Sequence, residues 1–283
     1  MDNTDFLELN DITFTYPPIE GDLDENGKQI EPKPVFEHFS ASLPNGFVSF
    51  VGQNGCGKTT LMLLASGRLN PDSGTVSLLG KNPATLDEEQ KNLLASVIYQ
   101  NMEFETEDKV SELLSFVYQN GALKGNAPSI RGNGDLLSEV TEVFELKDVL
   151  DHALTHLSKG EIQRVLLAFG ILYGSESLFM DEPLFAMENP QKEAALAYFK
   201  EFVHKTGKSI YISMHELDLT KKYADTVLLF YPDRSMALGT PEEVLTRDDV
   251  EKAYGVPYAM LKDHENLSRE YLNSLTQSEK KAD

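Results

Sequence analysis

One glycine-rich stretch has the residue types and spacing of a phosphate-binding loop. It runs from Gly52 to Thr60 and fits the pattern G-x-x-x-x-G-K-[ST]. Its glycines let successive backbone N–H groups turn inward toward an anion. The ammonium of Lys58 can reach the β- and γ-phosphates of a nucleotide, and the hydroxyl of Thr59 can bind Mg²⁺. The residues predicted to contact a nucleotide here are Gly52, Asn54, Gly55, Cys56, Gly57, Lys58, Thr59 and Thr60.

The segments on either side of this loop support the same interpretation. Residues 47–51 read Phe-Val-Ser-Phe-Val and predict a buried strand, and residues 61–65 read Leu-Met-Leu-Leu-Ala and predict a helix. A helix N-terminus adds a dipole that favours bound anions. The alternative is a glycine-rich turn without a ligand, which requires all four fixed positions of the motif to coincide by chance.

Cys56 is the only cysteine in the chain. A single cysteine excludes an internal disulfide and agrees with a reducing compartment. Lys58 and the N-terminus of the predicted helix lie close by, and both features lower the pKa of a thiol. We therefore expect a reactive thiol at the nucleotide site. The alternative is a small residue that merely fits a tight turn.

Polar residues follow three further predicted strands, and the carboxyl ends of strands are where ligands collect in an open α/β sheet. Asp181 can hold Mg²⁺ beside the loop, and Glu182 can polarise an attacking water. Gln100 can bridge metal and water, because its amide both donates and accepts, and His215 can donate to the γ-phosphate. Taken singly, these residues could instead be a cap, a surface glutamine and a locally satisfied histidine. The strands concerned are residues 95–99 before Gln100, 177–180 before Asp181 and 209–214 before His215.

Together and in this order, these residues resemble the motifs of the ATP-binding cassette (ABC) ATPases over nearly the whole chain. Residues 52–59 resemble the Walker A motif, and residues 178–182 resemble Walker B with its catalytic glutamate. Gln100 resembles the Q-loop glutamine, and His215 resembles the switch histidine. Tyr16 lies where the family stacks an aromatic ring on adenine. The resemblance implies ATP as the nucleotide, Mg²⁺ bound by Thr59, Gln100 and Asp181, and catalysis by Glu182, His215 and Gln100.

Residues 157–161, Leu-Ser-Lys-Gly-Glu, resemble the family signature L-S-G-G-Q. In the family, Ser158 and the backbone of Gly160 would contact the γ-phosphate bound on the opposite subunit. The resemblance therefore implies a head-to-tail pair with two composite ATP sites, either a homodimer or a pair with another ABC ATPase.

Two departures from the family pattern are present. Lys159 and Glu161 stand in the signature where Gly and Gln are usual, although Ser and the second Gly remain. The D-loop of the family usually ends in Leu-Asp, and residues 186–189, Ala-Met-Glu-Asn, occupy it here. Glu188 keeps the charge but is longer than Asp, which affects the expected geometry across the dimer.

The C-terminal part of the chain resembles the ATPases of importers. Residues 238–246 and 253–256 resemble those of iron-chelate and vitamin B12 importers, and residues 14–17 resemble those of energy-coupling-factor vitamin and cobalt transporters. Import of a metal chelate or vitamin is thus favoured. The alternatives are another importer, an exporter, a soluble ABC protein that acts on ribosomes or DNA, or a nucleotide-dependent regulator.

The expected fold is α/β, because predicted strands and helices alternate along most of the chain. The resemblance implies a P-loop NTPase fold of the ABC ATPase type, with an antiparallel β subdomain and an inserted helical subdomain. A strand with alternating apolar residues is expected over residues 6–16. The expected parts of one ABC ATPase domain, 1–283, are a RecA-like core with the N-terminal antiparallel β subdomain (1–100 and 166–240), a helical signature subdomain (101–165) and a C-terminal helical extension (241–283).

Composition and charge restrict the partners. Hydrophobic residues make up 41% of the chain and the net charge is −21. That charge disfavours nucleic acid and anionic membrane surfaces. The longest apolar run, residues 165–173, is about half of the roughly 18 residues that a membrane span needs. A separate transmembrane permease is therefore expected as the partner, with this chain cytoplasmic and peripheral on the inner face of the cell membrane.

Two acidic segments have further interpretations. Residues 22–27 match the first half of a calcium loop, but Lys33 stands where the loop needs Glu, so a solvated β-hairpin around Asn26-Gly27 is favoured. Residues 101–108 follow Gln100 and carry Met102 and Phe104 among four carboxylates. In the resembling family this segment lines the groove that receives a permease helix. The alternative is a solvated acidic loop.

Overall fold

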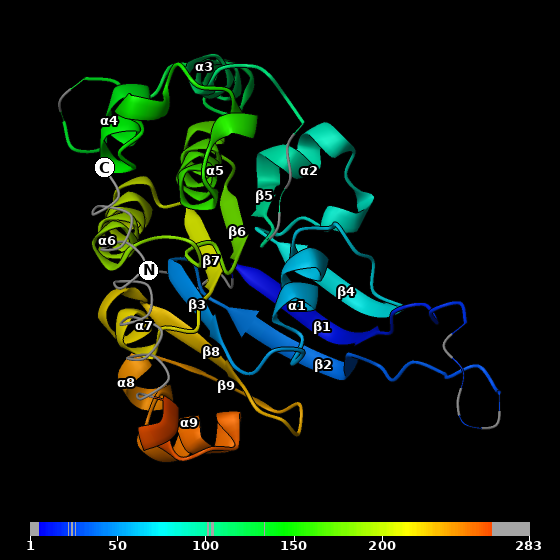
Figure 1. The fold of residues 1–283 in the computed structure, drawn as a ribbon. Helices are drawn as coiled ribbons and strands as arrows, with labels where there is room; N and C mark the ends of the chain where they lie inside the picture. The colour runs from blue at the N-terminus through cyan, green and yellow to red at the C-terminus, as the bar shows by residue number, and fades with distance from the viewer. Residues whose placement is uncertain are drawn as a thin grey trace.

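Two β-sheets form the centre of the molecule, with helices packed around them (Figure 1). The computed structural model describes residues 6–261 except 22, 24, 26, 101, 103, 104 and 133. The larger sheet has the strand order β5-β6-β7-β3-β8-β9. Its strands are β3 (Phe47–Val51), β5 (Ala95–Ile98), β6 (Ser177–Asp181), β7 (Ser209–Ser213), β8 (Thr226–Phe230) and β9 (Met236–Gly239).

The first five strands of this order run parallel, as the expected α/β fold with alternating strands and helices requires. Strands β3, β6 and β7 are buried along their whole length, as their mainly apolar sequences predict. Parallel strands present their carboxyl ends at one edge. The residues that follow β3, β5, β6 and β7 therefore meet there.

Strand β9 was not predicted from the sequence. It is an edge strand of four residues that pairs antiparallel with β8 and is only partly buried. Its three apolar residues, Met236, Ala237 and Leu238, are too few for a strand to be predicted from them, and they do not alternate with polar residues. The strand forms because a turn brings it back against β8, and this pairing is not visible in the sequence of β9 itself.

The smaller sheet is antiparallel, with the order β2-β1-β4. Its strands are β1 (Leu7–Phe14), β2 (Phe36–Leu43) and β4 (Ser73–Leu78). Leu7, Leu9 and Ile12 of β1 are fully buried or nearly so. They share one apolar core with Phe50 of β3 and with α1 (Lys58–Ala65). This shared core joins the antiparallel sheet to the strand and helix on either side of the phosphate-binding loop.

The remaining helices cover the sheets (Figure 1). They are α2 (Glu88–Leu94), α3 (Val110–Asn120), α4 (Leu136–Val143), α5 (Lys159–Tyr173), α6 (Asn189–Thr206), α7 (Leu217–Tyr223), α8 (Pro241–Val244) and α9 (Arg247–Tyr254), with short 3₁₀ turns at Pro83–Thr85, Lys147–Val149 and Leu154–His156. Helices α3, α4 and α5 pack together at one end of the molecule. The proposed boundary of a helical subdomain at residues 101–165 stays a prediction.

A buried polar contact links this group of helices to the rest of the core. The hydroxyl of Tyr198 on α6 donates to Oε1 of Glu139 on α4 at 2.6 Å, and both residues are buried. Ser129 also hydrogen bonds to this carboxylate, and the N–H of Arg131 donates to it at 2.9 Å. These donors together hold the pKa of Glu139 below its usual value, although burial alone would raise it.

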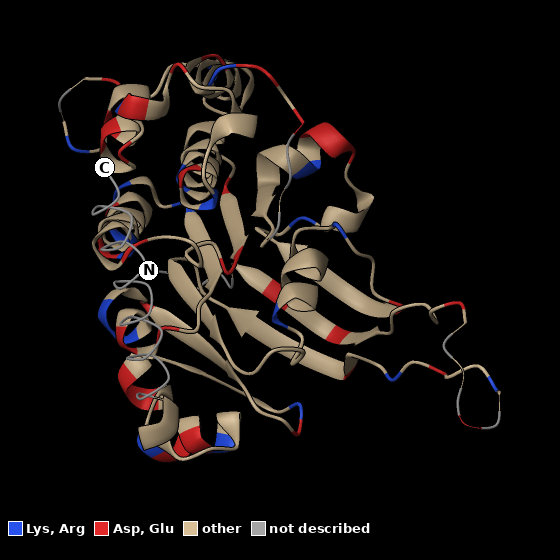
Figure 2. Ribbon diagram, in the orientation of Figure 1, with Lys and Arg blue, Asp and Glu red and all other residues tan. Residues whose placement is uncertain are grey.

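Charged residues lie mainly on the outer helices and loops, whereas the strands of the larger sheet are almost free of them (Figure 2). Within the described part of the chain, no helix is both long enough and apolar enough to cross a membrane. An antiparallel bridge joins Leu23 to Gln29, as a hairpin requires. Residues 22, 24 and 26, on which the calcium alternative depends, lie outside the described residues.

Candidate nucleotide site

The loop from Gly52 to Gly57 joins β3 to α1, as predicted. Gly57 is the N-cap of α1 with a φ of 106°, in the left-handed region that favours glycine. A Cβ at this position would lie 3.1 Å from the ring of Phe36 and 3.2 Å from Cγ1 of Val35. Glycine is thus required both by the backbone conformation and by the close packing of β2.

Lys58 is the first residue of α1, and its side chain folds back over the loop. Its ammonium donates to the carbonyl of Gly52 at 2.8 Å and to that of Gln53 at 2.9 Å. The residue is buried. The loop carbonyls therefore hold a positive charge at the loop, as a phosphate site requires.

Asp181 and Thr59 meet at the carboxyl end of β6. The hydroxyl of Thr59 donates to Oδ2 of Asp181 at 2.5 Å, and the hydroxyl of Ser213 donates to Oδ1 at 2.6 Å. No group of three or more His, Cys, Asp or Glu side chains that could hold a metal occurs among the described residues. A hydroxyl beside a carboxylate still fits Mg²⁺, which takes one or two protein oxygens and binds the remainder of its shell to phosphates and water.

The three residues predicted to be catalytic share one hydrogen-bond network. Nε2 of Gln100 donates to Oε2 of Glu182 at 2.7 Å, and Nε2 of His215 lies 2.6 Å from Oε1 of the same carboxylate. The hydrogen bond from His215 holds the pKa of Glu182 below its usual value, and partial burial opposes this effect. The carboxylate is therefore ionised at neutral pH and is held by donors on two sides.

The backbone of Glu182 is also unusual. Its φ is 47°, in the left-handed region that a residue with a Cβ seldom adopts. Its N–H donates to Oγ of Ser213 at 2.8 Å, so Ser213 contacts both acidic residues of the site. Ser213 was not predicted from the sequence. The sequence feature that could have indicated it is a serine near the end of the predicted strand at residues 209–214. In the structure this serine pairs with Asp181 in the parallel register of β6 and β7.

Tyr16 lies beside the start of α1. Its hydroxyl shares a hydrogen bond of 3.1 Å with Oγ1 of Thr60. The ring packs edge-on against Phe14 with 4.9 Å between centroids, and 40% of the residue is exposed. An aromatic surface is thus accessible next to the phosphate-binding loop, as stacking on a base requires.

The prediction of a lowered thiol pKa at Cys56 is wrong. Sγ lies 3.9 Å from the ammonium of Lys58, and that charge does lower the pKa. Burial of the thiol has the larger, opposite effect, so the pKa of Cys56 is raised. Proximity to a lysine and a helix is visible in sequence, whereas the loss of hydration is not.

The signature residues begin α5. Ser158 is its N-cap: its Oγ accepts from the N–H of Glu161 at 3.3 Å, and Glu161 accepts from the N–H of Ser158 at 2.8 Å. These two hydrogen bonds form a capping box. Among the described residues, no hydrogen bond joins Ser158 or Gly160 to the loop of residues 52–60, which lies at a different place in the fold.

Gly160 contacts the segment that follows Glu182. A Cβ on Gly160 would lie 2.7 Å from the carbonyl oxygen of Ala186, closer than real Cβ atoms approach. Glu188 is the N-cap of α6, and its N–H donates to the side chain of Gln191 at 3.3 Å. The start of α5 and the segment from Ala186 to Glu188 are therefore closely packed.

The segment predicted to contact a permease is only partly described. Residues 101, 103 and 104 lie outside the described residues, so the expected groove around Phe104 stays a prediction. Met102 is half-buried and packs against the core formed by the helices.

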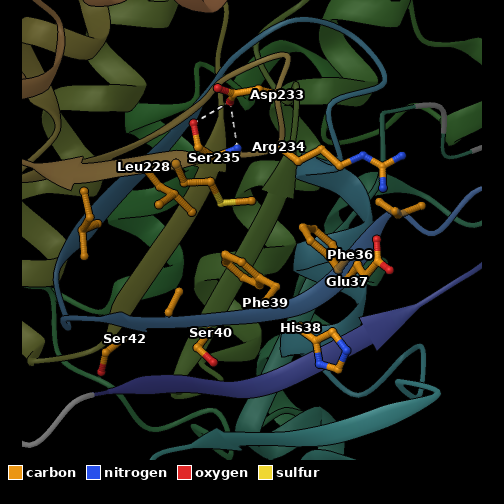
Figure 3. Close-up of a pocket in the computed structure, with 14 residues that line it drawn as sticks. Phe36, Glu37, His38, Phe39, Ser40, Ser42, Leu228, Asp233, Arg234 and Ser235 are labelled. Carbon is orange, nitrogen blue, oxygen red and sulfur yellow. Dashed lines mark hydrogen bonds between the residues drawn. The ribbon is translucent and has the colours of Figure 1, made fainter.

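A separate cavity of about 680 Å³ lies between β2 and the hairpin of β8 and β9 (Figure 3). Apolar side chains such as Phe36, Phe39 and Met236 line it, together with Asp233 and Arg234 of the hairpin turn. None of the residues predicted to bind the nucleotide or to act in catalysis lines this cavity.

Comparison with known proteins gives a consistent result. Residues 36–185 match the family model described as ABC transporter. The chain is 30% identical over 251 residues to the hemin import ATP-binding protein HmuV of Escherichia coli O157:H7, covering 84% of this chain and 93% of that protein. It is 27% identical over 231 residues to the petrobactin import ATP-binding protein YclP of Bacillus subtilis, covering 80% and 89%.

The fold is also similar to that of a solved structure, a dimeric ATP-binding cassette in a post-hydrolysis state bound to ADP and Pi. The TM-score is 0.64 at 18% identity, covering 78% of this chain and 93% of that one. At this identity the similarity concerns the fold alone.

Proposed function

This chain belongs to the ABC transporter family, as a subunit that hydrolyses ATP for transport, and we propose that Glu182 is the general base of that hydrolysis. The observation that carries the proposal is the position of the Glu182 carboxylate, which accepts hydrogen bonds from Gln100 and His215. These donors fix its two oxygens at the carboxyl end of β6. A carboxylate held in this way can accept a proton from a water that attacks the γ-phosphate.

The other residues of the site have complementary roles in this proposal. The inward-facing N–H groups of residues 52–60 and the ammonium of Lys58 bind the phosphates. Thr59 and Asp181 would hold Mg²⁺, with Gln100 as a third ligand, and Mg²⁺ when bound neutralises charge on the β- and γ-phosphates. Tyr16 stacks on the base. His215 orients Glu182 and donates to the γ-phosphate.

A second ATPase subunit completes the site in the proposed assembly. Ser158 and the backbone of Gly160 contact the nucleotide bound by the opposite subunit, either an identical copy or another ABC ATPase. Their lack of a hydrogen bond to the phosphate-binding loop of the same chain, among the described residues, supports this arrangement. A transmembrane permease is the other partner, and the chain lies on the cytoplasmic face of the membrane bound to it.

The transported substrate is proposed to be a metal chelate, with import as the direction. The proteins that support this are named for petrobactin, hemin, siderophore and manganese transport. The proposed parts of the chain are a nucleotide-binding core, a helical part at 101–165 that carries the signature, and a C-terminal extension from residue 241.

The experiment is purification of the chain with its membrane partner, followed by reconstitution into lipid vesicles. Uptake and ATPase activity are measured with a ferric siderophore, hemin, cobalamin and Mn²⁺ offered separately, together with the matching binding protein. We expect ATP-dependent uptake of one of the metal chelates. ATP-dependent export, or ATPase activity that responds to none of these solutes, would contradict the proposed cargo and direction.

A further inference from the structure

A buried ion pair joins the first turn of α6 to the residue that follows His215. The ammonium of Lys192 on α6 pairs with Oε1 of Glu216, and the two side chains are only 8% and 23% exposed. Lysine is seldom buried to this extent unless it has a partner of opposite charge. No motif in the sequence predicts a role for either residue.

Glu216 is fixed from two directions. It is the N-cap of α7, and its carbonyl accepts from the N–H of Thr220 at 2.9 Å and from the Thr220 hydroxyl at 3.0 Å. Its side chain is held by Lys192. His215 directly precedes Glu216 in the chain. Contacts of Glu216 with both α6 and α7 therefore restrict the backbone that carries the imidazole of His215.

The electrostatics of Glu216 agree with a strong attraction. Burial alone would raise the pKa of its carboxyl, but the charge and hydrogen bond of Lys192 hold this pKa below its usual value. Breaking such a pair by removing one partner leaves an uncompensated buried charge, which is strongly destabilising. The direction in which the carboxylate points is therefore set by Lys192.

A second ion pair between the same two helices lies in solvent. Nζ of Lys222 on α7 lies 2.5 Å from Oε2 of Glu193 on α6, and these side chains are 56% and 47% exposed. The hydroxyl of Tyr223 also donates to this carboxylate at 3.2 Å. Helices α6 and α7 thus have contacts that do not involve Lys192, and the exposed pair is a matched control for the buried one.

We propose that Lys192 is a positioning residue for ATP hydrolysis, which acts through Glu216 to hold His215 against Glu182. This inference rests on the proposed role of His215. The distance that it explains is the 2.6 Å between Nε2 of His215 and Oε1 of Glu182. Helix α6 begins at Asn189, directly after the segment packed on Gly160, so the pair also connects that segment to His215.

The test compares variants of the full chain for steady-state ATPase activity, ATP binding and thermal unfolding. Lys192→Met should lower kcat about 10-fold or more, because a small misplacement of a catalytic group is costly. KM and the Kd for MgATP should be nearly unchanged, since Lys192 contacts no predicted nucleotide residue. Lys192→Arg, which keeps the charge, should recover most of kcat. Lys222→Met, the exposed control, should behave as the parent chain does.

A double variant separates positioning from stability. Lys192→Met with Glu216→Gln leaves no unpaired buried charge, so its unfolding temperature should return toward that of the parent chain. Its kcat should remain low, because no ion pair then holds the side chain of residue 216 against α6. A double variant that regains both stability and kcat would show that the pair is only structural, and so would a Lys192→Met variant with parental kcat.

His215→Ala, measured in the same series, distinguishes a failure of the proposed role of His215 from a failure of the inference about Lys192. If His215→Ala loses activity and Lys192→Met does not, the inference about Lys192 is wrong and the proposed role of His215 stands. If His215→Ala hydrolyses ATP at the parental rate, the proposed role of His215 is wrong, and the inference fails with it.

Discussion

The hydroxyl of Thr59 donates to Oδ2 of Asp181 at 2.5 Å, although 122 residues separate the two in the chain. Thr59 is the second residue of α1 and Asp181 is the last residue of β6, so the parallel sheet brings them together. Two oxygens this close can both contribute to the octahedral shell of one Mg²⁺ ion. We therefore expect the loss of either oxygen to weaken the binding of Mg²⁺ together with ATP.

Asp181→Asn should weaken MgATP binding about 10-fold or more, because groups that hold or orient a metal have effects of this size. Binding of ATP in excess EDTA should change little, since the phosphate contacts of the loop remain. The measurement is titration with a fluorescent ATP analogue under both conditions. An equal loss of affinity with and without Mg²⁺ would contradict the assignment of Asp181 to the metal.

Gly160→Ala should lower ATPase activity about 10-fold, because the new methyl would displace the carbonyl of Ala186 from a 2.7 Å contact. Alanine is a better helix former than glycine, so loss of helix propensity cannot explain a defect. ATP affinity of the isolated chain should be retained. Lys159→Ala, which changes an exposed side chain of the same turn, is the control. Equal activity of the two variants would contradict the importance of this close packing.

Tyr198→Phe should reduce the free energy of unfolding by about 1–3 kcal/mol at pH 7, because it removes a donor from the buried carboxylate of Glu139. The pKa of Glu139 is lowered in the folded chain, so this stabilisation is present above the unfolded value of about 4.3. It is lost as the pH falls through the lower folded value.

The measurement is urea unfolding of both chains between pH 7 and the lowest pH at which they remain folded. The difference between them should shrink as the pH falls. A difference that stays constant, or grows, would contradict an ionised Glu139 as the partner of Tyr198.

Cys56 should react slowly with a maleimide at pH 7, because its thiol has a raised pKa and is partly buried. Labelling should accelerate as the pH rises, and it should level off at a higher pH than for an ordinary thiol, whose pKa is about 8.5. Saturating MgATP should protect it, since it lies inside the phosphate-binding loop. The unfolded chain, which has no other cysteine, gives the unprotected rate. Equal labelling with and without MgATP would contradict its place at the nucleotide.

Much of the site was predictable because its residues end apolar strands. Each predicted residue lies at or just after the end of such a strand, and the carboxyl ends of parallel strands meet at one edge of the sheet. These residues are Gln100, Asp181, Glu182 and His215. The structure places Gln100 and His215 on the same carboxylate, that of Glu182. Local sequence and one rule of topology were sufficient for this part.

Other features depend on tertiary contacts that no local pattern records. Ser213 acquires its role from the register of β7 against β6, and Lys192 acquires its role from the packing of α6 against α7. The pKa of Cys56 depends on how much of the thiol is buried, and that depends on the whole loop. Strand β9 exists because β8 offers an edge.

The proposed role of Glu182 as the base for ATP hydrolysis is best tested by the ATPase rate of Glu182→Gln. The substitution keeps the size of the side chain and removes its basicity. The account predicts a fall in kcat of about 100-fold or more, with the Kd for MgATP retained and an ATP-bound dimer detectable by size-exclusion chromatography. A variant that hydrolyses ATP at a rate close to that of the parent chain would contradict it.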